Sequence, residues 1–414
     1  FDGFRVILFQ QTGGLNQAEM EAGLEMNMDF SLAIINAFNM GDMFNGVGYQ
    51  IRPYEVVPGK TDEIMAKNLD LMHDIMRDKS RYETNGTWKS ILSMAKLDGT
   101  VNYMGKFYDQ LFGKDYTHGL NEVRDKFNEI EVDRFRVKPV VKITGEFWAQ
   151  LTEGDGNFNM FRFLEGENAE VLVEPVGTWI QYIMWQYKAG IKDRKSVGEG
   201  EFDIPAWRLD KKLAIELSYW KKVATMTIAE KIFEREYNRF QNALGGTLHD
   251  LVDQYELQRL GHPHYNTAAG GGEGHLEVAK NIYYTSKNLA HMVLSLKPFG
   301  CMPSAQSDGA QAAVVEQYKD MIFLPIETSG EGEVNAHSRV QMALGGARVK
   351  AKEEFKSTLE KTGKSLDELK TYVAEHPELK KPMYKVPHVE GIIGTAATFA
   401  LHVSDLIDGK IGTA

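Results

Sequence analysis

The chain has 414 residues, of which 43% are hydrophobic and 25% charged, and it carries a formal net charge of −11. This is the composition of an ordinary soluble globular protein, and the acidic balance argues against a nucleic-acid or anionic-membrane partner. No apolar run approaches the ~20 residues of a membrane span, and the first residues lack the pattern of a signal peptide. The single cysteine excludes an internal disulfide framework and fits a reducing environment. We therefore expect a cytoplasmic protein without membrane insertion.

The length exceeds the size at which one hydrophobic core usually stops growing, so two or three lobes are expected. Residues 5–9 form a predicted buried strand, followed by a turn at Gly13 and Gly14 and then a helical pattern. Amide groups at such a turn can hold an anion at the start of a helix, although a plain connection uses the same glycines. A phosphate site at these glycines is therefore one of two alternatives. Residues 49–55 are predicted to be extended, and a helix is predicted over residues 61–79.

The middle of the chain alternates between helical and extended patterns. Residues 84–135 have helical spacing with glycine breaks and are predicted to join the later long helices in a separate lobe. A strand over 134–143, a short helix over 157–164 and a strand over 169–175 follow. This succession is the clearest parallel-sheet signal in the chain. A long helix is predicted over residues 210–244, where two glycines end the pattern.

A glycine-rich segment, AAGGGEGH, follows at residues 268–275. It lacks the lysine and the serine or threonine of a phosphate-binding P-loop. Gly272 and Gly274 precede a helical pattern, so their amides are candidates for holding the anionic group of a cofactor or for letting another chain approach closely. We interpret three nearby histidines as loop residues without a metal, because their spacing matches no standard ligand signature: His262, His264 and His275.

The last part of the chain contains a strand–loop–helix pattern twice. Apolar runs at residues 292–296 and 321–324 lead into loops that carry Cys301 and Glu327, respectively. Helices are predicted after these loops, over residues 308–320 and from about residue 334 onward. In an open parallel sheet such loops lie beyond the carboxyl ends of the strands, where ligands bind. Cys301 is predicted to precede a helix N-terminus, where the helix dipole favours the thiolate that binds metal or attacks a substrate. No histidine stands at a spacing that makes this thiol a catalytic nucleophile.

Six stretches of the sequence carry a resemblance to a known family. They are residues 5–14, residues 51–59, KPVVKITGEFWAQLTEGDGNFNMFRFL at 138–164, GEGHL at 272–276, GCMPSAQSDGAQ at 300–311 and LPIETSGEGEVNAHSRVQM at 324–342. In these stretches the chain resembles the 2-hydroxyacyl-CoA dehydratase and benzoyl-CoA reductase superfamily. It is most similar to the branch described as acyl-CoA dehydratase activase-related, relatives of double-cubane iron–sulfur proteins.

The resemblance implies two Rossmann-like or flavodoxin-like parallel-sheet lobes with an additional helical region. It also implies an oxygen-sensitive iron–sulfur cluster, reduced by an ATP-hydrolysing activator protein, and electron transfer to a difficult acceptor such as an acyl-CoA thioester. The first loop of that branch carries a cysteine, whereas this chain has Gly13, Gly14 and Asn16 there. An iron–sulfur cluster takes three or four cysteine ligands. Cys301 is therefore either one ligand of a cluster shared with a partner chain or a partly buried thiol in a retained turn.

The resemblance also indicates the wall of a cleft. Four residues match the family's pattern: Glu327, Thr328, Ser329 and Glu333. They would line the cleft opposite Cys301, and the first three are catalytic candidates. Alternatively, they only cap and begin the helix that follows. Glu146 comes directly after the strand predicted at 134–143 and joins the same cleft.

Three functional hypotheses follow from these patterns. The first is a subunit of an ATP-coupled, low-potential iron–sulfur reductase or dehydratase-type complex, in which ATP acts only through a partner activator. The second is a cluster-free structural or regulatory paralogue within such a complex, and the third is a nucleotide-binding protein that uses the glycine turns. The predicted organisation is a first α/β segment (1–83), a helical region (84–135), an α/β segment (136–200), a long-helix region (201–260) and a C-terminal α/β lobe (261–414).

Overall fold

The computed structural model describes residues 28–79, 98–196, 208–269, 272–329 and 332–412. At its centre lies a four-stranded sheet with the order β2-β1-β3-β4, in which every strand pair is parallel. The predicted α/β class with a parallel sheet is therefore confirmed. The strand predicted at 5–9 and the turn at Gly13 and Gly14 lie outside the described residues. The strands are β1 (Val140–Gly145), β2 (Glu170–Leu172), β3 (Met292–Pro298) and β4 (Phe323–Thr328).

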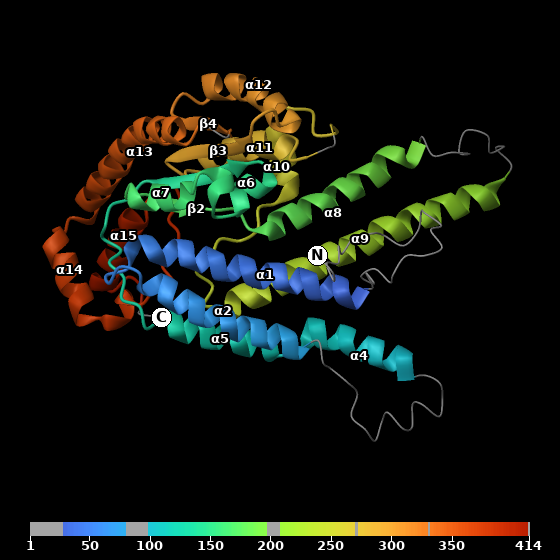
Figure 1. The fold of residues 1–414 in the computed structure, drawn as a ribbon, viewed down its shortest axis with the longest axis horizontal. Coiled ribbons are helices and arrows are strands. Elements are labelled where there is room, and N and C mark those ends of the chain that lie inside the picture. The colour runs from blue at the N-terminus through green and yellow to red at the C-terminus, as the bar shows by residue number, and fades with distance from the viewer. Residues whose placement is uncertain (1–27, 80–97, 197–207, 270–271, 330–331, 413–414) are drawn as a thin grey trace, which may run out of the picture.

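Helices cover both faces of this sheet (Figure 1). On one face the fully buried Ile143, Leu294 and Ile326 pack with residues of α7 (Met160–Gly166) and α13 (Glu333–Thr362). On the other face Val293 packs with side chains from three helices. The apolar, β-branched residues of β1 and β3 suit strands that are buried on both sides. The helices of the second face are α8 (Val176–Asp193), α10 (Gln254–Gly261) and α11 (His275–Ser286), with α12 (Met302–Gln317) packed on α11.

A helical bundle with its own core lies beside the sheet (Figure 1). Met43, Leu120 and Phe240 are completely buried in this core and come from three different helices. Helix α5, from the region 84–135, packs on the later long helix α9. The bundle helices are α1 (Met28–Ile51), α2 (Lys60–Lys79), α4 (Asp98–Phe112), α5 (Asp115–Phe127) and α9 (Leu209–Ala243).

Some predicted elements differ from the structure at their boundaries. The extended segment predicted at 49–55 is wrong: α1 continues to Ile51, because Met43, Val47 and Ile51 form one buried helical face, and a 3-10 turn follows at Arg52–Tyr54. The helix predicted from residue 308 already begins at Met302, where proline in the first turn costs no hydrogen bond.

The chain ends in two helices that pack against α13. Phe399 and Leu369 are buried in a core shared by α14 (Leu366–Glu375) and α15 (Thr395–Ile407). Ser365 caps the start of α14, since its hydroxyl accepts a hydrogen bond from the Glu368 amide at 3.2 Å. Within the described ranges, the structure contains no helix that is both long and apolar enough to cross a bilayer.

Candidate functional site

The carboxyl ends of three strands meet at one edge of the sheet. Gly145 of β1 pairs with Leu296 of β3, and the end of β3 pairs with Thr328 of β4. The amide of Phe299 donates to the Thr328 carbonyl at 3.1 Å, so the pairing continues into the loop. The edge brings together the loops that hold the predicted site residues Glu146, Cys301, Glu327, Thr328 and Ser329.

Cys301 lies at this edge as the N-cap residue of α12. Its side chain makes no capping hydrogen bond, and the residue is a partly exposed free thiol. Gly300 before it has φ of +74°, a region that favours glycine, which turns the chain sharply from strand to helix. The predicted position of the thiol, after a strand and before a helix, is confirmed.

The glycine-rich loop packs directly on the Cys301 helix. Gly272 has φ of +60°, and a Cβ atom at this position would lie 2.6 Å from Cγ of Pro303. Glu273 is buried and accepts a hydrogen bond from the Phe147 amide at 2.8 Å. Burial raises the pKa of this carboxyl group. The loop of Gly272 and Gly274 therefore ties the Cys301 loop to the loop that follows β1.

The predicted acidic and hydroxyl residues occupy different positions along the edge. Glu146 is the N-cap of the short helix α6 (Phe147–Leu151), where its carboxylate accepts from the Ala149 amide at 2.9 Å. Glu327 is exposed, and the Thr328 hydroxyl donates to the Lys297 carbonyl at 3.3 Å. The alternative that these residues cap and begin the next helix holds only for Glu333, which lies in the first turn of α13, because the N-cap of that helix is Gly332. Ser329 is exposed three residues before it.

Large apolar side chains around Cys301 are exposed. Phe299 is 75% exposed, Met302 is 70% exposed, and Trp148 on α6 is 67% exposed. Scattered exposed apolar residues are common, but these three flank the loops of a single sheet edge. We call Trp148, Phe299 and Met302 the apolar rim. Exposed apolar residues at one edge of a sheet make that edge a candidate surface for another protein.

Behind the edge lies a buried ionic cluster that the sequence-based analysis missed. Lys297 of β3 is 1% exposed and forms an ion pair with Asp308 of α12. Its Nζ atom also lies 3.5 Å from Oε1 of Glu277, which is equally buried. Glu277 accepts hydrogen bonds from Ser295 and, at 2.5 Å, from Ser307. This cluster fixes the start of α12, and therefore Cys301, relative to β3.

A second buried ionic cluster lies on the same face of the sheet. Nζ of Lys142 is 2.6 Å from Oε2 of Glu174, and Lys280 approaches the same carboxylate at 3.9 Å. Burial alone would raise the pKa of Glu174, but the two lysine charges lower it to about 2. Burial lowers the pKa of Lys142 to about 8. A lysine inside an otherwise apolar strand run, as in VVKITG and VLSLKP, is the sequence signal for both clusters.

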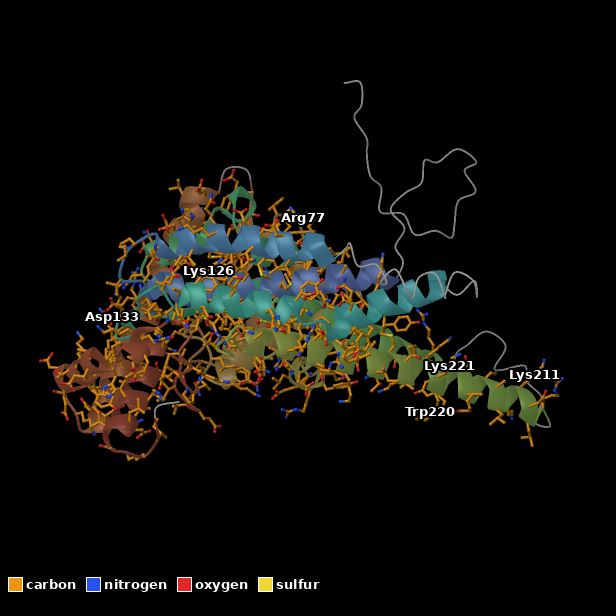
Figure 2. The ribbon with its side chains drawn as sticks, turned by 90° about the horizontal axis from the view of Figure 1, so that it is seen from below. Arg77, Lys126, Asp133, Lys211, Trp220 and Lys221 are labelled. Carbon is orange, nitrogen blue, oxygen red and sulfur yellow. The ribbon has the colours of Figure 1, made fainter. Side chains whose placement is uncertain are left out.

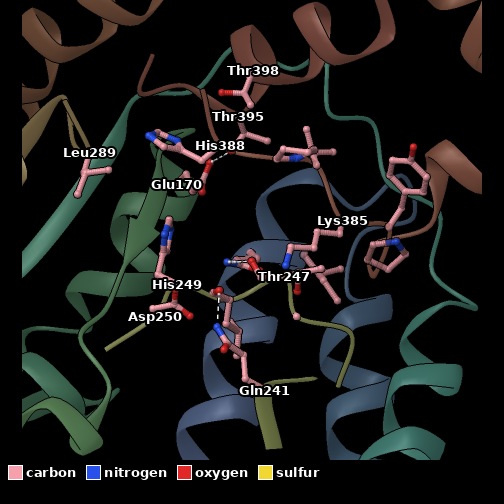
Figure 3. A pocket seen from close by; sticks show the side chains of 18 of the residues that line it. Glu170, Gln241, Thr247, His249, Asp250, Leu289, Lys385, His388, Thr395 and Thr398 are labelled. Atoms are coloured by element: carbon pink, nitrogen blue, oxygen red, sulfur yellow. Dashed lines mark hydrogen bonds between the residues drawn. The ribbon is translucent and has the colours of Figure 1, made fainter. Parts of the chain in front are cut away.

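A large cavity lies at the opposite end of the sheet, beside the amino ends of β1 and β2 (Figure 3). Its volume is about 710 Å³, and its walls come from the end of α9, the loop before α10 and the segment before α15. His249 and His388 face each other across it (Figure 3). Glu170 lines the same cavity and accepts from Thr395 at 2.7 Å. Desolvation by the surrounding protein lowers the pKa of His249, although part of the residue remains exposed.

The histidines near the glycine-rich loop have structural surroundings. Nδ1 of His262 lies 2.9 Å from the Thr267 hydroxyl. His275 is fully buried against the rings of Tyr182 and Trp185, and both of its ring nitrogens lack a hydrogen-bond partner. Burial lowers its pKa to about 4, so the ring is neutral at physiological pH. Nowhere in the described ranges do three or more His, Cys, Asp or Glu side chains gather as a metal site.

Comparison with known proteins gave no match. No family model, no curated protein and no solved structure aligns significantly with this chain. The candidate site is therefore interpreted from its own geometry and from the family resemblance of its motifs.

Proposed function

We propose that this chain is a member of the 2-hydroxyacyl-CoA dehydratase and benzoyl-CoA reductase superfamily. In this proposal it acts as a subunit of an ATP-coupled, low-potential iron–sulfur complex that passes electrons to an acyl-CoA or a similarly difficult acceptor. The observation that carries the proposal is the position of Cys301, the single thiol of the chain. It lies partly exposed at the carboxyl edge of a parallel sheet, the edge at which such folds bind ligands.

The residues of this chain fit one ligand of a cluster and not a complete cluster. A cluster takes three or four cysteine ligands, and the chain has one cysteine. The apolar rim around Cys301 supports a partner chain at this edge, which would supply the remaining ligands. When bound, the cluster would supply the one-electron chemistry. ATP would act through a separate activator protein.

The other residues of the edge would then position the thiol and handle protons. The ion pair between Lys297 and Asp308 holds the first turns of α12 against β3, which fixes the direction of the Cys301 side chain. Glu327 is exposed on the neighbouring strand, where its carboxyl group would act on an acceptor bound at this edge. Glu146 and Ser329 would play a lesser part, since Glu146 already caps α6.

The experiment is anaerobic purification of the chain with its native partners, followed by iron analysis and electron paramagnetic resonance. The Cys301→Ser variant is compared with Ser304→Ala, which changes a neighbouring buried residue on the same helix. We expect Cys301→Ser to lower the iron content and change the spectrum while the complex still assembles, and Ser304→Ala to preserve both. Unchanged iron and an unchanged spectrum in Cys301→Ser would refute ligation and favour the cluster-free structural subunit.

A further inference from the structure

Helices α8 and α9 extend away from the sheet and the bundle as an arm (Figures 1 and 2). The outer part of α9 exposes large apolar side chains instead of burying them. Trp220 is labelled on this projecting part in Figure 2. We define the α9 stripe as the following exposed residues: Leu209 (71%), Leu213 (71%), Leu217 (69%), Trp220 (58%) and Ile228 (60%).

The α9 stripe lies on one face of the helix. Its members are spaced by three, four or eight residues, and at ~100° per residue they fall within an arc of about 100°. Helix α8 does not cover this arc, because it is held on the adjoining face. There Lys195, in the 3-10 turn that follows α8, pairs with Glu216 at 3.1 Å. Its Nζ atom lies 4.5 Å from the ring centroid of Tyr219 and 5.8 Å from that of Trp220, so it reaches only the margin of the stripe. Lys188 pairs with Glu230 further along the same face.

We propose that the α9 stripe is a homodimer interface, in which α9 of a second copy of this chain packs against it in the antiparallel direction. This proposal rests on the stripe alone and is independent of the proposed function. With the two-fold axis next to Trp220, Leu213 of one copy faces Ile228 of the other, and Leu217 faces Ala224. Each stripe then covers the apolar surface of its partner along about 30 Å of helix.

The charges at the two ends of the stripe favour the antiparallel direction. Asp210 is exposed beside Leu209, where it pairs with Arg208 of its own chain at 2.8 Å, and Lys231 is exposed one turn after Ile228. Antiparallel packing brings Asp210 of each copy next to Lys231 of the other. Parallel packing would instead place like charges side by side, including Lys221, which borders the arc, with its own copy.

The apolar area agrees with a small but specific dimer. At the exposures given above, the five side chains offer roughly 600 Å² per copy, or about 1,200 Å² in total, which is the lower end of the range for specific interfaces. A basic helix with leucines and a tryptophan can also lie on an anionic membrane surface. The opposite charges at the ends of the stripe have no role on a lipid surface, and they favour a second copy.

The first test is the molar mass of the full chain in solution, measured by size-exclusion chromatography with light scattering. We expect a dimer for the unmodified chain and a monomer for Leu217→Asp. Each substitution acts twice in a symmetric interface, so we expect the dissociation constant of the dimer to rise at least ~100-fold. Ser218→Asp is the matched control, since it adds the same charge at the neighbouring exposed residue outside the arc. Circular dichroism checks that both variants keep their helices.

The second test fixes the direction of packing by cross-linking in a Cys301→Ser background. An equal mixture of Leu213→Cys and Ile228→Cys chains is expected to form a disulfide-linked dimer on oxidation, whereas Leu213→Cys alone is not. A monomer at every concentration, equal dissociation by Ser218→Asp, or efficient self-linking of Leu213→Cys would each overturn the proposal. A monomer that binds phosphatidylserine vesicles, and loses this binding in Leu217→Asp, would assign the stripe to a membrane surface instead.

Discussion

The buried pair of Lys142 and Glu174 makes the sharpest prediction about stability. In a Lys142→Met variant the apolar side chain keeps most of the lysine volume, but Glu174 loses the cation at 2.6 Å. Lys280 at 3.9 Å and the hydroxyl groups of Thr178 and Tyr284, at 2.9 and 3.1 Å, remain as partners. Removing one member of a buried ion pair costs ~3–5 kcal/mol. Because those partners remain, we expect the free energy of unfolding to fall by about 3 kcal/mol, the lower end of that range.

The pH dependence gives the same prediction a second, independent readout. In the unmodified chain the pKa of Glu174 is lowered to about 2, so its stabilising contribution is present above the unfolded pKa and is lost as the pH falls toward 2. Without Lys142, we expect burial to raise the folded pKa of Glu174 above the unfolded value. The pH dependence of the Glu174 contribution to stability then changes sign. Stability is then lost as the pH rises through that folded pKa. The deficit of Lys142→Met is therefore expected to be smaller at pH 5 than at pH 7.

The assay is urea unfolding followed by tryptophan fluorescence at pH 5 and pH 7. The double variant Lys142→Met/Glu174→Gln removes both charges and is expected to be more stable than Lys142→Met alone. A loss of less than about 1 kcal/mol in Lys142→Met would refute the ion-pair account, since surface substitutions alone reach that range. A double variant no more stable than the single one would refute it as well.

Two further predictions concern backbone strain and a buried histidine. Gly145→Ala is expected to lower the free energy of unfolding by at least ~2 kcal/mol. Gly145 has φ of +115°, and the added Cβ would lie 2.0 Å from the Leu296 carbonyl oxygen. Urea unfolding measures the loss, and Gly156→Ala is the control because this glycine has open space around it. The folded pKa of His275, lowered to about 4, means that stability falls as the pH drops from the unfolded pKa near 6.5 toward 4. His275→Phe is expected to flatten this part of the pH–stability profile, and an unchanged slope would show that another group is responsible.

The strands, their parallel pairing and the loops at their ends could be predicted, because short apolar runs followed by glycine and a helical pattern are local signals. The position of Cys301 before α12 follows from such a signal. The segment at 49–55 was predicted wrongly because packing of Ile51 in the bundle core overrides the local extended preference. The pairing of Lys142 with Glu174 depends on strands β1 and β2 lying side by side, which no local pattern specifies.

The cavity at the amino ends of the strands could not be predicted for a similar reason. Glu170, His249 and His388 are far apart in the sequence, and only the tertiary fold brings them to one cavity (Figure 3). The exposure of an apolar helix face is also not given by the sequence, although its spacing is. The α9 stripe has helical spacing that is visible in the sequence, but spacing alone indicates a buried face as readily as an exposed one, and only the structure distinguishes the two.

The central claim is that the Cys301 sulfur is a ligand of an iron–sulfur cluster at an interface with a partner chain. Since Cys301 is the single cysteine of the chain, selenocysteine at this position labels one atom of this subunit. X-ray absorption at the selenium edge of the anaerobically isolated complex then reports the neighbours of that atom directly. If Cys301 binds the cluster, iron is expected in the first shell of the selenium. A first shell containing only carbon, in a complex that contains iron, would contradict it.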